Sequence, residues 1–282
     1  MSESIRLGLI GENIAYSRSP DIFQAIFSVT GRSGEFKIYS VLQADLPHTI
    51  ETLRTLPLDG LAVTVPFKRT VISLLDELDA VSTLLQAVNC IRFDGSFTRG
   101  FNTDVDGFAA GLQPLRAKVT GCRALILGAG GAASAAIYSL IHEFGVREIV
   151  VAARPGRNLD LLTNQFAAYP DVAFNTFTLD SLESGDYATC GLIVNCTPLG
   201  GWHFPEICPL PASFIWPSDA VYYDMNYNDN GIGVQIAREA GLIAIDGSSM
   251  LVAQAIRSYE IWTGVQSPFE PVYEACFGRS SR

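Results

Sequence analysis

The sequence has little of what builds metal centres or hydrolytic sites. It holds only three histidines, no two at metal-ligand spacing, and its six cysteines form no Cys-x-x-Cys pair. Zinc sites depend on such spacing, so no metal is expected, and the cysteines are expected to stay reduced. A Gly-x-Ser-x-Gly segment is also absent, which leaves a serine hydrolase without support.

Positive charge is scarce as well. Lys and Arg number 19 against 29 Asp and Glu, giving a net charge of −10 and no basic run. Nucleic-acid binding requires clustered cations, so a nucleic-acid partner is not expected. The first residues lack the apolar core of a signal peptide, which favours a cytoplasmic protein. Residues 124–141 carry no charge, but their three glycines and Ala-rich composition argue against a membrane span.

A glycine-rich turn lies in mid-chain. The apolar run 123–127 breaks into Gly128-x-Gly130-x-x-Ala133 and continues as the Ala-rich segment 132–144. This pattern is typical of a strand that turns into a helix whose N-terminus receives a diphosphate. A second strand, residues 148–153, follows about 20 residues after the first glycine, where the ribose-reading residue is expected. The sequence therefore predicts a dinucleotide-binding βαβ unit.

Strands and helices also alternate before this turn, which predicts an α/β sheet there. We expect two α/β domains with a cleft between them. Residues 1–105 plus 247–282 form a substrate-binding, catalytic domain, and residues 106–246 form a Rossmann-like, doubly wound cofactor domain. Expected strands are 5–10, 36–42, 60–65, 88–93, 97–101, 191–195, 220–224 and 242–245; expected helices are 20–30, 46–56, 70–78 and 248–263.

Polar side chains interrupt the hydrophobic pattern at several element ends. Five of them are neutral hydrogen-bond donors and acceptors, which suit a ligand with several hydroxyls: Ser17, Ser19, Thr64, Asn89 and Gln254. Lys68 and Asp104 supply a proton-handling pair for an alcohol that loses its hydroxyl proton as hydride leaves carbon. Each also has a plainer interpretation: Ser19 caps a helix, Asn102 and Asp104 form an Asx turn, and Lys68 is a solvated surface lysine.

Seven segments in this order resemble the shikimate dehydrogenase family, including its quinate/shikimate dehydrogenase branch. They are Ser17-x-Ser19-Pro20, Val63-Thr64-x-Pro66-x-Lys68, Ala87-Val88-Asn89, Asn102-Thr103-Asp104, Gly128-x-Gly130-Gly131-Ala132, Asn195-x-Thr197-Pro198-Leu199-Gly200 and Asp246-Gly247…Met250-Leu251-Val252-x-Gln254. The resemblance covers nearly the whole chain.

The resemblance implies a role for each matching residue. Lys68 and Asp104 would be the catalytic pair. The substrate carboxylate would meet Ser17 and Ser19, with Tyr227 nearby, and the ring hydroxyls would meet Thr64, Asn89, Asp104 and Gln254. Residues expected at the cofactor are Gly128, Gly130, Gly131, Ala132, Arg154, Arg157, Thr197 and Gly247.

The implied activity is an NADP-dependent oxidoreductase that interconverts shikimate and 3-dehydroshikimate, a step of the chorismate pathway. NADP is favoured over NAD because Arg154 and Arg157 follow the second strand, with no acidic residue before Asp160. The expected partner is a small polyhydroxylated carboxylate, and the chain is expected to be a monomer or a homodimer.

Three segments depart from the family pattern, and one of them is residues 228–233, which lack the Pro and Thr common after the tyrosine. Ala62 replaces an Asn that would hydrogen-bond the substrate, and Ala153-Arg154-Pro155-Gly156-Arg157 replaces a loop that usually reads Asn-Arg-Thr. These changes leave two alternatives open. One is an NAD-dependent quinate or quinate/shikimate dehydrogenase, and the other is a catalytically weak binding or regulatory paralogue.

Overall fold

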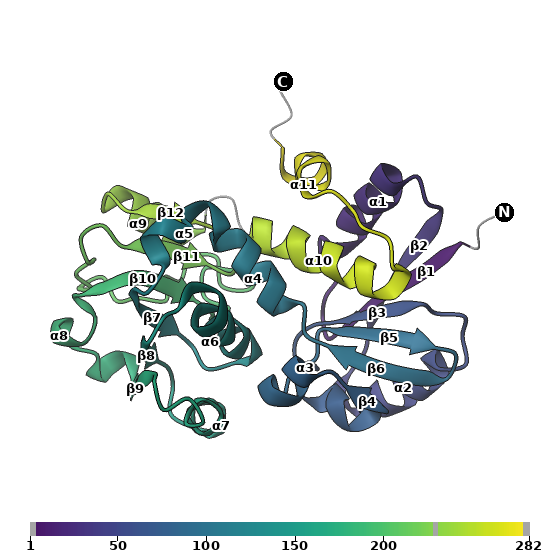
Figure 1. Cartoon of the computed structure of the whole chain (residues 1–282), viewed down its shortest axis with the longest axis horizontal. Coiled ribbons are helices and arrows are strands. Elements are labelled where there is room, and N and C mark those ends of the chain that lie inside the picture. The colour runs from purple at the N-terminus through teal and green to yellow at the C-terminus, as the bar shows by residue number, and fades with distance from the viewer. Residues whose placement is uncertain (1–3, 228–230, 279–282) are drawn as a thin grey trace. The chain divides into compact units, whose positions relative to one another are not determined.

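The computed structural model describes residues 4–227 and 231–278, which divide into two compact units (Figure 1). The N-terminal unit runs up to Gly107 and is completed by the segment from Val252 onward; the central unit is Phe108–Leu251. Both junctions fall inside helices, α4 (Asp104–Leu112) and α10 (Ser248–Thr263). The sequence placed them at 105/106 and 246/247.

The N-terminal unit is built on a mixed six-stranded sheet. Its order is β2 (Gly34–Ser40), β1 (Ile5–Gly11), β3 (Gly60–Val63), β5 (Cys90–Asp94), β6 (Phe97–Phe101) and β4 (Glu77–Leu78). The first three strands are parallel, while β5 and β6 form an antiparallel hairpin. The carboxyl ends of β1 and β3 lie beside each other, because Ile10 pairs with Val63.

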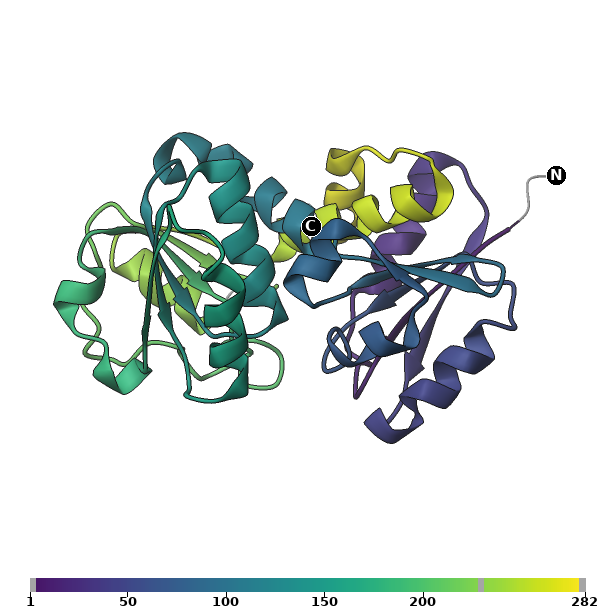
Figure 2. The same cartoon turned by 60° about the horizontal axis from the view of Figure 1, so that its bottom comes forward.

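Helices cover both faces of this sheet. Figure 2 shows α1 (Ser19–Thr30) and α10 on one side and α2 (Leu46–Leu53) on the other. On the α10 side, Gly60 leaves room for Trp262, whose ring also lies 5.5 Å from that of Phe23. On the α2 side, Leu61 and Val63 pack with α2 residues. The remaining elements are η1 (Gln43–Asp45), η2 (Thr70–Leu74), α3 (Ala80–Leu85) and α11 (Phe269–Phe277).

The central unit has six parallel strands in the order β12 (Ile243–Ile245), β11 (Val221–Asp224), β10 (Cys190–Asn195), β7 (Arg123–Leu127), β8 (Glu148–Ala152) and β9 (Ala173–Phe177). The order reverses between β7 and β10, which confirms the doubly wound arrangement and the α/β class. Its helices are α5 (Arg116–Val119), α6 (Gly131–Phe144), α7 (Arg157–Phe166), α8 (Ser184–Tyr187) and α9 (Ile232–Glu239), with short turns η3 (Gln113–Leu115) and η4 (Leu179–Ser181).

One expected element is wrong. Residues 70–78 do not form one helix, because η2 ends at Leu74 and the chain then forms β4 alongside β6. Asp76 explains the change. Its carboxylate accepts hydrogen bonds from Thr98 N and Oγ1 and pairs with Arg54 at 2.6 Å, so this segment is tied to β6.

Candidate functional site

Lys68 and Asp104 form an ion pair within the N-terminal unit. Lys68 Nζ lies 2.6 Å from Asp104 Oδ2. The lysine side chain is 22% exposed and the aspartate side chain 6%, so the pair is largely shielded but can be reached through the ammonium. The interpretation of Lys68 as a fully solvated surface lysine is therefore wrong.

Asn89 fixes the other oxygen of this aspartate. Its Nδ2 donates to Asp104 Oδ1 at 2.8 Å, and its Oδ1 accepts from Thr103 N at 2.7 Å. Asn89 itself is held between strands, because Asn89 N donates to Phe101 O and Val63 N donates to Asn89 O. Since Asn89 is buried, this amide can hold the carboxylate in one orientation without competition from water.

Further hydrogen bonds hold the segment 102–104 in place. Asp104 N donates to Asn102 Oδ1, so the Asx turn of the plainer interpretation is present, and it coexists with the ion pair at Asp104. Asn102 Nδ2 donates to Ala87 O. Thr103 Oγ1 lies 3.0 Å from Ser258 Oγ, which donates to Gln254 O in α10. Sequence reasoning gave no role to the side chains of Thr103 and Ser258, because a buried Thr–Ser contact 155 residues apart leaves no local pattern.

The other expected substrate residues lie at strand and helix ends. Thr64 directly follows β3 and contacts the end of β1, where a Cβ on Gly11 would lie 2.6 Å from Thr64 Cγ2. Ser17 Oγ accepts from Ser19 N and lies 3.1 Å from Ser19 Oγ. Ser19 is the first residue of α1 and Arg18 holds the cap position, so Ser19 is not the helix cap. Gln254 is half-buried in α10.

Ala62 lies on the face of the sheet that α10 covers. Side chains alternate along β3, and Leu61 and Val63 face the core beneath α2, so Ala62 shares the opposite face with Gly60. Ala62 pairs with Cys90, the residue that follows Asn89. Ala62 is partly exposed. A larger polar side chain at this position would extend over the sheet face beside Thr64.

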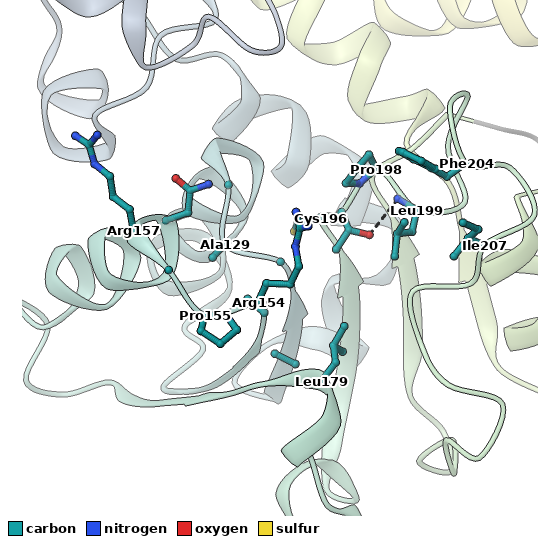
Figure 3. A pocket seen from close by; sticks show the side chains of 17 residues that line it. Ala129, Arg154, Pro155, Arg157, Leu179, Cys196, Pro198, Leu199, Phe204 and Ile207 are labelled. Atoms are coloured by element: carbon teal, nitrogen blue, oxygen red, sulfur yellow. Dashed lines mark hydrogen bonds between the residues drawn. The ribbon is translucent and has the colours of Figure 1, made fainter.

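The glycine-rich turn lines a cavity of about 800 Å³ in the central unit (Figure 3). Gly128 has φ +101°, and a Cβ there would lie 3.1 Å from Thr197 Cγ2, so the turn itself requires this glycine. No described atom lies within 4 Å of a Cβ on Gly130. Packing therefore does not require Gly130 to be glycine; the open space beside it suits a ligand that approaches the N-terminus of α6.

The cavity has a basic wall formed by the loop after β8. Arg154 and Arg157 line it, and no described lining residue is Asp or Glu. Both arginines are exposed, and neither forms an ion pair within the described ranges. In Figure 3, Arg154 extends from the loop into the space that the drawn side chains surround, whereas Arg157 projects away from it. A guanidinium at the mouth of a cavity suits a phosphate group.

Of the remaining residues expected at the cofactor or the substrate, some line the cavity and others do not. Thr197 lines the cavity, whereas Gly247 does not. Instead Gly247 packs against the Met225 backbone, where any Cβ would collide with the carbonyl. Gly131 and Ala132 form the first turn of α6, and Tyr227 is a half-buried residue of the central unit.

Sequence reasoning missed the apolar wall made by Phe204 and Ile207. Both lie in residues 196–220, a segment without helix or strand. Its length was the available signal, since long loops in compact domains are often functional.

Two further findings concern metal ligands and membrane-spanning helices. Within 4–227 and 231–278, no three His, Cys, Asp or Glu side chains gather as metal ligands. In the same ranges, no helix combines the length and apolar character needed to cross a membrane.

Comparison with known proteins gives consistent matches. A model of the shikimate dehydrogenase substrate binding domain matches residues 9–91, and one of the shikimate 5'-dehydrogenase C-terminal domain matches residues 247–277. A Pelodictyon phaeoclathratiforme protein named shikimate dehydrogenase (NADP(+)) is 35% identical over 272 residues, which covers 95% of each chain.

Two solved structures are similar over nearly the full length. Shikimate 5-dehydrogenase from Thermus thermophilus, in complex with NADP(H) and shikimate, has a TM-score of 0.84 and 26% identity, covering 96% of this chain and 98% of that chain. The Listeria monocytogenes enzyme, in complex with shikimate and NAD, has a TM-score of 0.87 and 25% identity, covering 98% of each.

Proposed function

The chain belongs to the shikimate dehydrogenase family, and we propose that it interconverts shikimate and 3-dehydroshikimate with hydride transfer to or from NADP. The observation that carries this proposal is the Lys68–Asp104 pair, shielded yet reachable through the lysine. An alcohol that is oxidised to a ketone must release its hydroxyl proton, and this pair offers a group that can handle it.

Lys68 and Asp104 would each have a role at the reacting hydroxyl. During oxidation Lys68 Nζ would accept the hydroxyl proton as a neutral amine and become an ammonium; during reduction the ammonium would return the proton to the oxygen. Asp104 would pair with the ammonium and accept a hydrogen bond from a ring hydroxyl. Asn89 keeps Asp104 oriented through its 2.8 Å hydrogen bond. Thr64 and Gln254 would bind further hydroxyls, and Ser17 and Ser19 would bind the carboxylate. Tyr227, assigned by resemblance alone, stays a prediction.

The central unit has features that fit a dinucleotide. Gly130 leaves open space at the first turn of α6, whose N–H groups have no intrahelical acceptor and therefore suit a diphosphate. Arg154 is free to pair with the 2′-phosphate that distinguishes NADP from NAD. When bound there, NADP supplies or accepts the hydride. Gly247 packs against the Met225 backbone, and its assignment to the cofactor stays a prediction.

Ala62 favours a second candidate substrate. The small side chain leaves space where the family has Asn, and this space suits a ring with a different substituent pattern, as in quinate. An exposed Arg154 next to Pro155 is also compatible with NAD, which requires no phosphate partner. The second candidate is therefore NAD-dependent oxidation of quinate, alone or together with shikimate.

Steady-state assays with shikimate and quinate, each with NADP and NAD, test the proposal. We expect the highest kcat/KM with shikimate and NADP. A higher kcat/KM with quinate and NAD would favour the second candidate, and no turnover with any pair would favour a binding or regulatory paralogue. Cytoplasmic location and a monomeric or homodimeric state stay predictions.

A further inference from the structure

Asp224 is a buried carboxylate at the end of β11 with no ion-pair partner among the described residues. It is 1% exposed, and neither the substrate assignment nor the cofactor assignment uses it. Its Oδ1 accepts from Asn226 N at 2.9 Å, Asn226 Nδ2 at 2.8 Å and Asn195 Nδ2 at 3.1 Å, and its Oδ2 accepts from Tyr222 OH at 3.4 Å. Among the described residues, only neutral N–H and O–H groups therefore stabilise the negative charge of Asp224.

The two asparagines that Asp224 holds face one short turn, Thr197–Leu199. Asn195 Oδ1 accepts from Thr197 N at 3.0 Å and from Thr197 Oγ1 at 2.7 Å, and its Nδ2 donates to Leu199 O at 2.9 Å. Asn226 Nδ2 donates to Thr197 O at 3.0 Å and to Leu199 O at 3.2 Å. The backbone of this turn is therefore fixed by two amides whose orientation depends on the Asp224 carboxylate.

The same turn forms one wall of the dinucleotide cavity. Thr197, Pro198 and Leu199 all line it. Thr197 also contacts the glycine turn, since a Cβ on Gly128 would lie 3.1 Å from Thr197 Cγ2. A shift of the turn would therefore change the cavity next to Gly128.

We propose that Asp224 is a positioning residue for the dinucleotide: it orients Asn195 and Asn226, which hold the Thr197–Leu199 turn as a cavity wall. This inference rests on the proposed function, because it takes the cavity to be the NADP site. Asp224 reaches this turn through these amides, and a Cβ on Gly200, the residue that follows the turn, would lie 3.5 Å from Asp224 Oδ2.

Fold stability alone does not account for a carboxylate at this position. Burying a charge without a cation is costly, and an apolar residue of similar size is usually easier to bury. Burial raises the pKa of Asp224 to about 6, which reflects this cost. What an apolar residue lacks is an acceptor that can orient two amides at once.

Three variants of the full chain separate positioning from stability. Asp224→Leu keeps the branched shape of the side chain but removes every acceptor. Asp224→Asn retains a carbonyl for the Oδ1 donors, and its amide can donate to the Tyr222 oxygen. Val234→Ala is the matched control, because it truncates a buried α9 residue of the same core without touching the turn. NADP affinity is measured by calorimetric titration, thermal unfolding reports stability, and kcat and KM for NADP are measured at saturating shikimate.

We expect Asp224→Leu to weaken NADP binding about tenfold and to raise KM for NADP more than it lowers kcat. Asp224→Asn should bind NADP within about twofold of the unmodified chain. Val234→Ala should lower the unfolding temperature with unchanged NADP affinity. Equal affinity in Asp224→Leu and the unmodified chain would overturn the inference alone. An unmodified chain that binds neither NADP nor NAD would overturn the proposed function and the inference with it.

Discussion

Each unit of the molecule holds one key aspartate through an asparagine, yet the two aspartates differ in their partners. Asp104 accepts from Asn89 on one oxygen and pairs with Lys68 on the other. Asp224 accepts from Asn195 and Asn226, with no cation among its described partners. An aspartate–asparagine hydrogen bond fixes orientation in both units, and among the described residues only the N-terminal aspartate also pairs with a cation. As proposed above, the same buried hydrogen-bond arrangement would serve proton transfer in one unit and the geometry of a cavity wall in the other.

The largest effect is expected when the cation that distinguishes Asp104 from Asp224 is removed. Lys68→Ala should lower kcat by about 10²–10⁴-fold, the usual cost of losing a general acid or base, with NADP affinity unchanged. Steady-state kinetics and titration with NADP measure the two quantities. Lys37→Ala, at a lysine of β2 that pairs with Glu35 at the surface, is the matched control and should leave both unchanged. Near-normal kcat in Lys68→Ala would mean that the N-terminal aspartate has no catalytic partner there.

The second prediction concerns the aspartate without a cation. The pKa of Asp224 is about 6 in the fold, compared with its ordinary value of 3.8, because burial disfavours its charged form. At this site the folded chain therefore holds more protons than the unfolded chain between about pH 4 and pH 6, so Asp224 makes stability fall as pH rises through this window. The neighbouring Tyr222, Cys196 and Cys208 have raised pKa values and do not titrate there.

Asp224→Asn should remove this fall and stabilise the chain at pH 7 by as much as about 3 kcal/mol. The measurement is the free energy of urea unfolding at several pH values in the unmodified chain and the variant. Asp76 provides a contrast, because hydrogen bonds and ion pairing with Arg54 lower its pKa to about 2. Its contribution is present above about pH 4 and is lost only as the pH falls towards 2. If both chains show the same pH slope between 4 and 6, Asp224 is not the titrating group.

The third prediction concerns the central unit, where Arg154 is proposed to distinguish NADP from NAD. Arg154→Ala should weaken NADP binding by about 10–100-fold, since charge-assisted hydrogen bonds contribute roughly 1.5–3 kcal/mol, and should leave NAD binding nearly unchanged. Arg116→Ala is a control in the same unit, at an arginine that donates to Glu143 O away from the cavity lining. Titration of each variant with NADP and with NAD provides the measurement. Equal losses for both cofactors would mean that Arg154 does not read the 2′-phosphate.

The sequence predicted these two regions to different extents. Gly128 and Gly130 mark the β7–α6 turn because turn geometry is local. Lys68, Asn89 and Asp104 were singled out by their motifs, but their hydrogen bonds depend on the pairing of β3, β5 and β6. The Asp224 network was missed because Asn195, Asn226 and Asp224 resemble ordinary turn residues until parallel strands bring them together. The wrong helix at 70–78 has the same origin, since Asp76 bonds to Thr98 across the sheet.

The smallest expected effect concerns Ala62, which tests the substrate side of the comparison. Ala62 lies on the α10 face of β3, near Thr64 and opposite Cys90. An Asn there would regain one hydrogen bond to a ring hydroxyl, an interaction of roughly 0.5–1.5 kcal/mol. Ala62→Asn should therefore lower KM for shikimate by up to about tenfold, with KM for NADP unchanged. Assays with shikimate and quinate side by side provide the measurement. A rise in KM for quinate alone would indicate that the small residue makes room for that ring, and no change for either substrate would mean that residue 62 does not face the substrate.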